Sequence, residues 1–405
     1  MRYKRITTVS MLMLGLLLMG GCDGLLDVED PGAVTDADLN HADTYEGLVA
    51  GMQADLDVAV GELAPVAGIM ADEWTFAATS SARINFQNGL IRDDQVGGEW
   101  NRIQRARWVA EDGIRRMTEV LEDAADQNEH VLKARILAGL ANRVAGEMFC
   151  QDVFDGGPAE PHTTAFHRAE AHFTEAIRLA EIQGHTDLRL GALGGRASVR
   201  AWLGEWSAAA ADAAQVPIDY QFDTEFWATG ATFAPGGRGG NDVWREVFHR
   251  LEYTVYGSPW AEVEDDPRVP WWVGEDELSH AIDGVTPMYV QDKYPQPNVD
   301  IPYVQGTELV LLRAEAALRQ GQVGDAVGFI NQNRAHYGLD PAGADNESEA
   351  WQLLKGERAA EVWLEARRFW DLRRWLAEGR DDFLANRDDC IPISERERRT
   401  NPNID

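Results

Sequence analysis

Residues 196–209 read Arg-Ala-Ser-Val-Arg-Ala-Trp-Leu-Gly-Glu-Trp-Ser-Ala-Ala, and part of this pattern returns later in the chain. Arg196 is followed eight residues later by Gly204, and Arg313 is followed at the same spacing by Gly321. An alanine stands five residues after each glycine. Each stretch therefore predicts a helix, a glycine-containing turn and a second helix whose small residues allow the pair to approach closely.

Hydrophobic residues recur with helical periodicity over most of the chain. The periodic stretches are 42–63, 99–122, 131–153, 165–183, 190–215, 305–335 and 349–378. We predict hairpins near 131–183, 190–215 and 305–378. The hairpin at 190–215 resembles a tetratricopeptide repeat, and such hairpins stack because one alone cannot bury its apolar face. The predicted fold class is all-α, with tetratricopeptide-like hairpins in one helical domain over 41–405.

Two stretches lack this periodicity. Glycine and proline become frequent over 217–302, and a similar loop-rich stretch runs over 72–98. The first stretch also gathers aromatic residues, namely Phe226, Trp227, Trp244, Tyr253, Tyr256, Trp260, Trp271 and Trp272. Long irregular segments in a compact helical protein are usually functional. We therefore expect a helical scaffold that carries a loop-rich, aromatic-rich ligand region near 217–302.

The N-terminus has the order of a secretory signal: a cationic start, an apolar run from Ile6 to Met19, and small residues before Cys22. This run is shorter than the roughly 20 residues that span a bilayer. Met19-Gly20-Gly21-Cys22 resembles a bacterial lipobox, in which the cysteine is lipidated and becomes the mature N-terminus. We predict a lipoprotein signal peptide over 1–21, lipidation of Cys22 and a tether over 22–40; an ordinary signal with an incidental cysteine is the alternative.

Acidic residues follow Cys22 closely and resemble the surface-export signal of Bacteroidetes-type lipoproteins; a merely solvated tether would look the same. The chain has a net charge of −31, and removal of the three basic residues of 1–21 takes it to −34. So acidic a protein is a poor partner for nucleic acid or for anionic lipid headgroups. We therefore expect attachment to the membrane through the N-terminal lipid and no binding to nucleic acid.

Cys150 and Cys390 are the only cysteines after Cys22. In an oxidising compartment two cysteines can pair, and a disulfide here would tie the C-terminal tail to the middle of the chain. Two unrelated buried thiols are the alternative, because spacing in the sequence does not show whether the two Cα atoms approach within about 7 Å.

The C-terminal third carries several short motifs in a fixed order. Ahead of the helical stretch 305–335 stand Asp266-Pro267-Arg268 and Lys293-Tyr294-Pro295; after it come Glu357-Arg358, Arg367-Arg368-Phe369-Trp370-Asp371 and Ile391-Pro392-Ile393. In this order and spacing they resemble the C-terminal half of the SusD/RagB family of outer-membrane lipoproteins. The resemblance is clear over 265–405 and weaker over 22–220.

This resemblance implies a lipid-anchored protein of the cell outer membrane that faces the cell surface and sits on a SusC-like TonB-dependent barrel. Family members capture nutrient, mostly glycans and in the RagB branch peptides, and deliver it to the barrel. A glycan ligand is therefore expected first and a peptide second. The chain is shorter than many members, and the missing length falls in the loop-rich part, where ligand contacts arise.

Other residue patterns could suggest catalysis. Glu357, Glu361 and Glu365 are spaced for one helix face, and paired carboxylates can act as acid and base on a sugar. With Arg358 and Arg368 nearby, we expect instead that they form ion pairs which fix the last helices. The sequence has no Gly-x-Ser-x-Gly elbow, phosphate-binding loop or cysteine quartet. We expect no enzyme activity, no cofactor and no metal site.

Loop aromatics are the best candidates for ligand contact, because Trp and Tyr offer rigid apolar faces with a polar group at one end. Polar side chains nearby would bind hydroxyl groups. The predicted ligand-binding residues are Asp72, Trp74, Arg83, Asn85, Tyr256, Trp260, Trp271 and Trp272. Tryptophans on helical stretches are expected in the core, namely Trp202, Trp206, Trp363, Trp370 and Trp375. The alternative function is a lipid-anchored tetratricopeptide-like scaffold that binds a protein partner and no small ligand.

Overall fold

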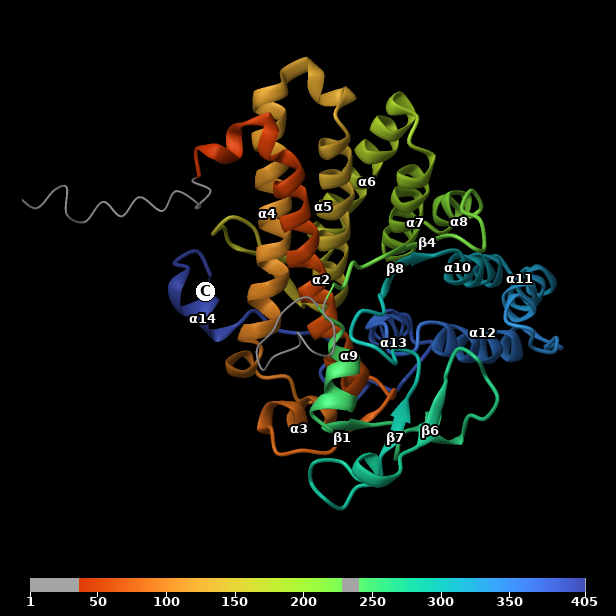
Figure 1. Ribbon diagram of the computed structural model, residues 1–405. Coiled ribbons are helices and arrows are strands. Elements are labelled where there is room, and N and C mark those ends of the chain that lie inside the picture. The colour runs from red at the N-terminus through yellow and green to blue at the C-terminus, as the bar shows by residue number, and fades with distance from the viewer. Residues whose placement is uncertain (1–35, 228–239, 405) are drawn as a thin grey trace, which may run out of the picture.

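The computed structural model describes residues 36–227 and 240–404, so the predicted signal peptide and Cys22 lie outside the described residues (Figure 1). Its helices are α2 (Tyr45–Met70), α3 (Ser81–Gln87), α4 (Gly97–Leu121), α5 (Glu129–Met148), α6 (Thr163–Gln183), α7 (Thr186–Trp202), α8 (Trp206–Ala213), α9 (Asp242–Trp244), α10 (Gly306–Arg319), α11 (Val323–His336), α12 (Glu347–Glu361), α13 (Arg367–Ala377) and α14 (Glu395–Thr400). The predicted all-α class of stacked helical hairpins is confirmed.

Most of the longer helices pack on their neighbours in the sequence, although α13 and α9 pack on α2. α2, α4, α5, α6 and α7 stand side by side as an upright array, and α8, α10, α11 and α12 continue it (Figure 1). Both turns of the repeated pattern contain a glycine in the left-handed backbone conformation that glycine favours. The φ angle is +78° at Gly204 and +71° at Gly321. These turns separate α7 from α8 and α10 from α11, as the sequence pattern predicts.

Four short antiparallel ladders join segments that lie between the helices. They pair β1 (Thr75–Phe76) with β5 (Tyr253–Thr254), β2 (Gln151–Val153) with β3 (Ala159–Pro161), β4 (Gln221–Asp223) with β8 (Pro302–Gln305), and β6 (Trp271–Val273) with β7 (Tyr289–Gln291). Strands this short carry too few residues to show an alternating pattern in the sequence. The predicted helical stretch 131–153 is therefore wrong at its end, because α5 stops at Met148 and the chain enters β2.

The stretch 349–378 is two helices and not one. Between α12 and α13 the backbone turns left-handed at Leu364 (φ +59°) and Ala366 (φ +68°). Contacts with distant residues hold this turn, since the backbone N–H of Leu364 donates to Glu73 Oε1 at 2.6 Å. Lys293 Nζ donates to the carbonyl oxygen of Trp363 at 2.9 Å. These contacts outweigh the local preference for helix.

The loop-rich segments gather at the C-terminal end of α2, the lower end in Figure 1, where α3, α9, β1, β6 and β7 lie together. β1 follows α2 directly and pairs with β5, and the N–H of Val255 donates to the carbonyl of Tyr289 at 2.9 Å. Residues 36–44 lead into the other end of α2, so the length of this helix separates them from the end where the loop-rich segments gather. Within the described ranges, no helix has the length and hydropathy required to cross a membrane.

Candidate functional site

The motif Asp266-Pro267-Arg268 fastens the loop-rich segment to the last helices. Arg268 is buried, and its Nη1 donates to Glu357 Oε2 on α12 at 2.8 Å and to Asn333 Oδ1 on α11 at 3.0 Å. Its Nε and Nη2 also donate to the Asp266 carboxylate at 3.0 and 2.7 Å. Charge-assisted pairs of this kind are the strong class of hydrogen bond. The motif therefore positions a loop and offers no free group to a ligand.

The three glutamates with helical spacing are held by hydrogen bonds and ion pairs. Glu357 pairs with Arg268, and Lys293 Nζ donates to Glu365 Oε1 at 2.7 Å. Glu361 accepts from Asn333 Nδ2 at 2.8 Å. Burial raises the pKa of Glu365 to about 7, although the Lys293 charge acts to lower it. Expected ion pairs are confirmed for Glu357 and Glu365, but Glu365 stands beyond the end of α12, off the shared helix face.

Asp72 and Trp74 hold the first loop to the core. The Arg368 guanidinium donates to both oxygens of Asp72 at 3.0 and 2.9 Å. Trp74 is 3% exposed, its indole N–H donates to the carbonyl of Pro65 at 3.1 Å, and its ring packs on Tyr253 at 4.8 Å between centroids. Trp74 therefore offers no face to a ligand and Asp72 is already paired. Burial therefore argues against the expected ligand contact for Trp74, whereas ligand binding by partly exposed Asp72 stays a prediction.

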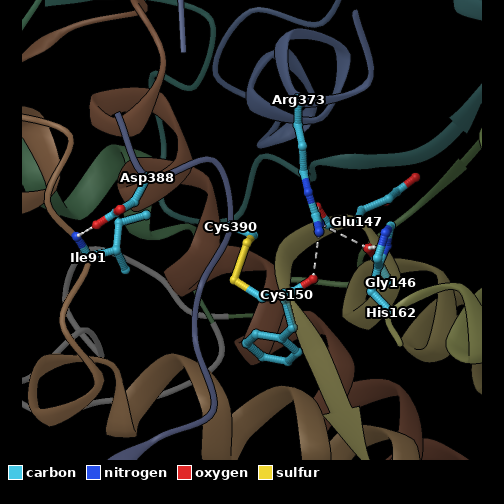
Figure 2. The surroundings of a disulfide bond; sticks show 9 residues. Ile91, Gly146, Glu147, Cys150, His162, Arg373, Asp388 and Cys390 are labelled. Carbon is cyan, nitrogen blue, oxygen red and sulfur yellow. Dashed lines mark hydrogen bonds between the residues drawn. A yellow bond between two sulfur atoms is a disulfide. The ribbon is translucent and has the colours of Figure 1, made fainter. Parts of the chain in front are cut away.

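The C-terminal tail is joined to α5 beside the disulfide of Cys150 and Cys390, whose Cα atoms lie 5.0 Å apart (Figure 2). The tail also reaches the loop after α3, where Asp388 Oδ2 accepts the N–H of Ile91 at 2.6 Å. Arg387 Nη2 donates to the carbonyl of Gln87 at 2.6 Å. The cross-linked tail thus supports the loop that follows α3.

Arg373 closes the C-terminal end of α5 next to this disulfide (Figure 2). Its Nη1 donates to the carbonyls of Gly146 and Glu147 at 3.2 and 2.9 Å, and its Nη2 donates to the carbonyl of Phe149 at 2.9 Å. The last carbonyls of a helix lack partners within the helix, and a cation there also meets the negative end of the helix dipole. Arg373 of α13 therefore caps the C-terminal end of α5 and holds the backbone just before Cys150 in position.

Three aromatic rings form a row on the loop-built end. Trp271 on β6 stacks on Tyr289 of β7, with centroids 4.9 Å apart and ring planes 3° from parallel. Tyr256 meets the edge of Tyr289 at 5.2 Å and is 41% exposed. The Trp271 indole N–H donates to the carbonyl of Val263 at 3.0 Å, which fixes the ring. The row of Trp271, Tyr289 and Tyr256 is rigid and partly open to solvent.

A pocket of about 490 Å³ borders this row and is lined by residues 263–267 and 269–271, including Trp271. Glu264 and Asp265 on its wall are exposed, whereas Asp266 is paired with Arg268. Hydrogen bonds from Arg268 outweigh the effect of burial and lower the pKa of Asp266. Carboxylates accept hydrogen bonds from hydroxyl groups, and a flat indole next to them accepts the apolar face of a sugar ring. This arrangement suits a carbohydrate.

A second pocket, of about 380 Å³, lies between α3, α9 and β5 and is strongly polar. Arg83, Arg245 and Arg250 line it together with acidic residues. Glu246 is 5% exposed, its Oε1 accepts from Arg250 Nη1 at 3.2 Å, and its buried Oε2 has no hydrogen-bond partner among the described residues. A buried oxygen without a partner carries a desolvation cost, which makes Glu246 an unusual feature of this pocket wall.

The remaining predicted ligand-binding residues differ in their exposure and in whether they line a pocket. Arg83 lines the polar pocket while pairing with Glu99 at 2.7 Å, and Asn85 bonds to Gln95 at 3.0 Å. Trp260 is 8% exposed, so its ring is not accessible to a ligand, which corrects that expectation. Trp272 is 38% exposed, but strand alternation places it on the face of the β6–β7 ladder opposite Trp271. The two neighbouring tryptophans therefore cannot line one surface.

Sequence reasoning missed Tyr289, Arg245, Arg250 and Glu246. Tyr289 stacks on Trp271 diagonally across the ladder, a relation that depends on the register of β6 and β7. The charged residues stand near α9, whose first residue directly follows the N-cap Asn241. Asn241 was a usable signal, because asparagine favours that position.

The SusD family model matches residues 292–404 of this chain. The fold is similar over nearly the whole chain to a SusD superfamily protein from Bacteroides vulgatus, with a TM-score of 0.66, 16% identity, and 91% of this chain and 98% of that chain covered. Residues 292–404 thus match the SusD family, and the chain has the fold of SusD superfamily proteins. Among curated proteins, none matches its sequence.

Two further SusD-like structures are named for what they bind. Surface glycan-binding protein A from Bacteroides thetaiotaomicron has a TM-score of 0.66 at 14% identity, over 90% of this chain and 98% of its own. A laminarin-binding SusD-like protein has a TM-score of 0.65 at 16% identity, over 89% and 98%. At these identities the likeness establishes a shared SusD fold.

Proposed function

We propose that this protein is a surface lipoprotein that captures a glycan and passes it to a SusC-like TonB-dependent transporter. The observation that carries the proposal is the row of Trp271, Tyr289 and Tyr256 beside a pocket with free carboxylates. Apolar sugar faces stack on such rings while hydroxyls bond to the acids. The glycan and laminarin binding named for two structural neighbours supports the same ligand class.

The geometry also suits capture away from the membrane. α2 has 26 residues, and at 1.5 Å per residue it separates its two ends by about 39 Å. The predicted tether leads into its N-terminal end, and the aromatic row lies near its C-terminal end. We propose that the lipid on Cys22 holds this N-terminal end toward the membrane and the aromatic row away from it.

The ion pairs of the carboxylates support a protein that binds its ligand without catalysing a reaction. The glutamates spaced for acid–base work, Glu357 and Glu365, are tied to Arg268 and Lys293, so they hold the fold. Across residues 36–227 and 240–404, no three metal-ligating side chains gather into a metal site. We therefore propose a binding protein, with a peptide as the second ligand class.

We expect Trp271→Ala and Tyr256→Ala each to weaken glycan binding at least fivefold, because truncating a stacked aromatic anchor often costs more than about 1 kcal/mol. A panel of glycans and peptides would first identify the ligand of the purified full-length protein, and calorimetry would then compare the variants. Trp108→Ala is the matched control, since Trp108 is 49% exposed on α4, away from the loop-built end. Equal affinities in all three variants would contradict the proposed site, and binding of peptides alone would change the ligand class.

Cys22→Ala is expected to release the protein from membranes or to leave its signal uncleaved, because the thiol that carries the acyl chains is gone. Each buried methylene contributes about 0.8 kcal/mol to anchoring, so several chains on one residue hold firmly. Membrane fractionation and labelling with an acyl-chain analogue measure the effect. Unchanged fractionation together with unchanged labelling would show that Cys22 is not the anchor.

A further inference from the structure

A third pocket, of about 660 Å³, lies toward the other end of α2, between α2, α5, α7 and β4. It begins at the first turns of α2, with Glu46 and Val49, so it is distinct from the aromatic row near the C-terminal end of that helix. Pockets that hold small ligands have volumes of roughly 300–1,000 Å³. The size therefore suits a ligand.

Five carboxylates line this pocket: Glu46, Asp187, Asp223, Glu225 and Asp300. None of them forms an ion pair with any described residue. Lys133, which also lines the pocket, is paired with Glu129 at 2.6 Å. In the last helices, by contrast, buried Glu308, Glu315 and Asp371 are each held by arginines. The pocket thus carries a surplus of negative charge that the protein itself does not neutralise.

Asp223 is the most informative of the five. Its Oδ1 is buried and has no hydrogen-bond partner among the described residues. Burial, with the neighbouring Asp300 charge, raises the pKa of Asp223 to about 6. Asp223 as a whole is only partly buried and lines the pocket, so a cationic donor in the pocket would supply the partner that this carboxylate lacks.

The walls around these acids are apolar and fixed in place. Val49, Ile136, Leu188 and Phe222 line the pocket, and such walls suit an aliphatic chain. Asp300 Oδ1 accepts the N–H of Phe226 at 2.7 Å, which holds the segment after β4 in position. This hydrogen bond fixes the Asp300 carboxylate in the pocket wall.

We propose that this pocket binds an organic cation: an ammonium or guanidinium group on an aliphatic stem, with the charged head at Asp223 and Asp300. An inorganic cation would not use the apolar wall, and an anion or a neutral sugar would leave the surplus negative charge unbalanced. The same chemistry is presented by a free amine and by a lysine or arginine side chain of a peptide. This inference does not depend on the glycan proposal.

The test uses calorimetry on the purified full-length protein with agmatine and with the peptide acetyl-Gly-Arg-Gly-amide; acetyl-Gly-Gln-Gly-amide is the neutral control. We expect at least one cationic probe to bind and the neutral peptide not to bind. Asp223→Asn with Asp300→Asn should weaken binding at least tenfold. Binding by agmatine identifies a small ligand, and binding by the arginine peptide alone identifies a peptide side chain.

Two further variants separate a site from general attraction to an acidic protein. Asp325→Asn with Asp340→Asn removes the same charge from exposed positions on and after α11 and should leave affinity unchanged. If the first pair fails to fold, Glu46→Gln with Asp187→Asn removes two exposed carboxylates of the pocket and should also weaken binding. Absence of binding by both cationic probes at millimolar concentration, or equal loss from pocket and control variants, would overturn the proposal.

Discussion

Removal of the Cys150–Cys390 disulfide is expected to lower the free energy of unfolding by about 5 kcal/mol. The bond closes a loop with a sequence separation of 240 residues, and in the chain-entropy account so long a loop gives a contribution of about 5 kcal/mol, less any native strain. Denaturant unfolding of the Cys150→Ala, Cys390→Ala double variant measures the loss. Adding a reductant to the double variant should change nothing, whereas it should destabilise the wild type.

The same change has a local consequence for the candidate site. Arg387 and Asp388 stand next to Cys390 and bind the loop after α3, the helix that carries Arg83. Loss of the cross-link should therefore speed amide hydrogen exchange at 87–91 before the helices of the array respond. Two titratable thiols in the unfolded, non-reduced wild type would show that the two cysteines do not pair in solution.

Glu315→Leu is the second change with a large expected effect, a loss of about 3–5 kcal/mol. Glu315 is fully buried, accepts from Arg374 Nη2 at 2.8 Å and from the Trp375 indole N–H at 3.0 Å, and pairs with Arg319 at 2.8 Å. Without this carboxylate, buried Arg374 keeps only Asp371 as an acidic partner, and partly buried Arg319 keeps only Glu378. Thermal and denaturant unfolding would measure the loss.

The pH dependence of this pair has a definite sign. Burial alone would raise the pKa of Glu315, but the charge and hydrogen bonds of Arg374 dominate and lower it. A lowered folded-state pKa gives stability that is present above the unfolded value, about 4.5, and is lost as the pH falls below it. Glu119→Gln is the matched control, because its pair with Arg115 is exposed and is worth at most about 1 kcal/mol. Equal losses from both variants would contradict the account.

The sequence predicted the helical array well because helices leave a local pattern. Gly204 and Gly321 stand in the turns where the repeated pattern places them. The break at Leu364 could not be predicted, because it depends on Glu73, which lies 291 residues away in the sequence. The family motifs prove to be structural, since Arg268 and Lys293 lock loops to the last helices. The charged residues of buried ion pairs can be recognised in the sequence motifs. The sequence does not show which of these residues pair with one another.

The candidate site was less accessible to sequence reasoning. Trp74, Trp260 and Trp271 all stand in loop-rich stretches, yet the first two are buried and only Trp271 borders a pocket. Composition does not reveal which way a loop side chain points, because that depends on the strand pairs formed after folding. Tyr289 enters the row only through the register of β6 with β7.

A crystal structure with the tightest-binding glycan of the panel tests the central claim most directly. The account predicts a sugar ring against Trp271 or Tyr256, with hydroxyl groups directed toward Glu264 and Asp265 in the adjoining pocket. A glycan bound on the surface of the helical hairpins, with the aromatic row unoccupied, would contradict it.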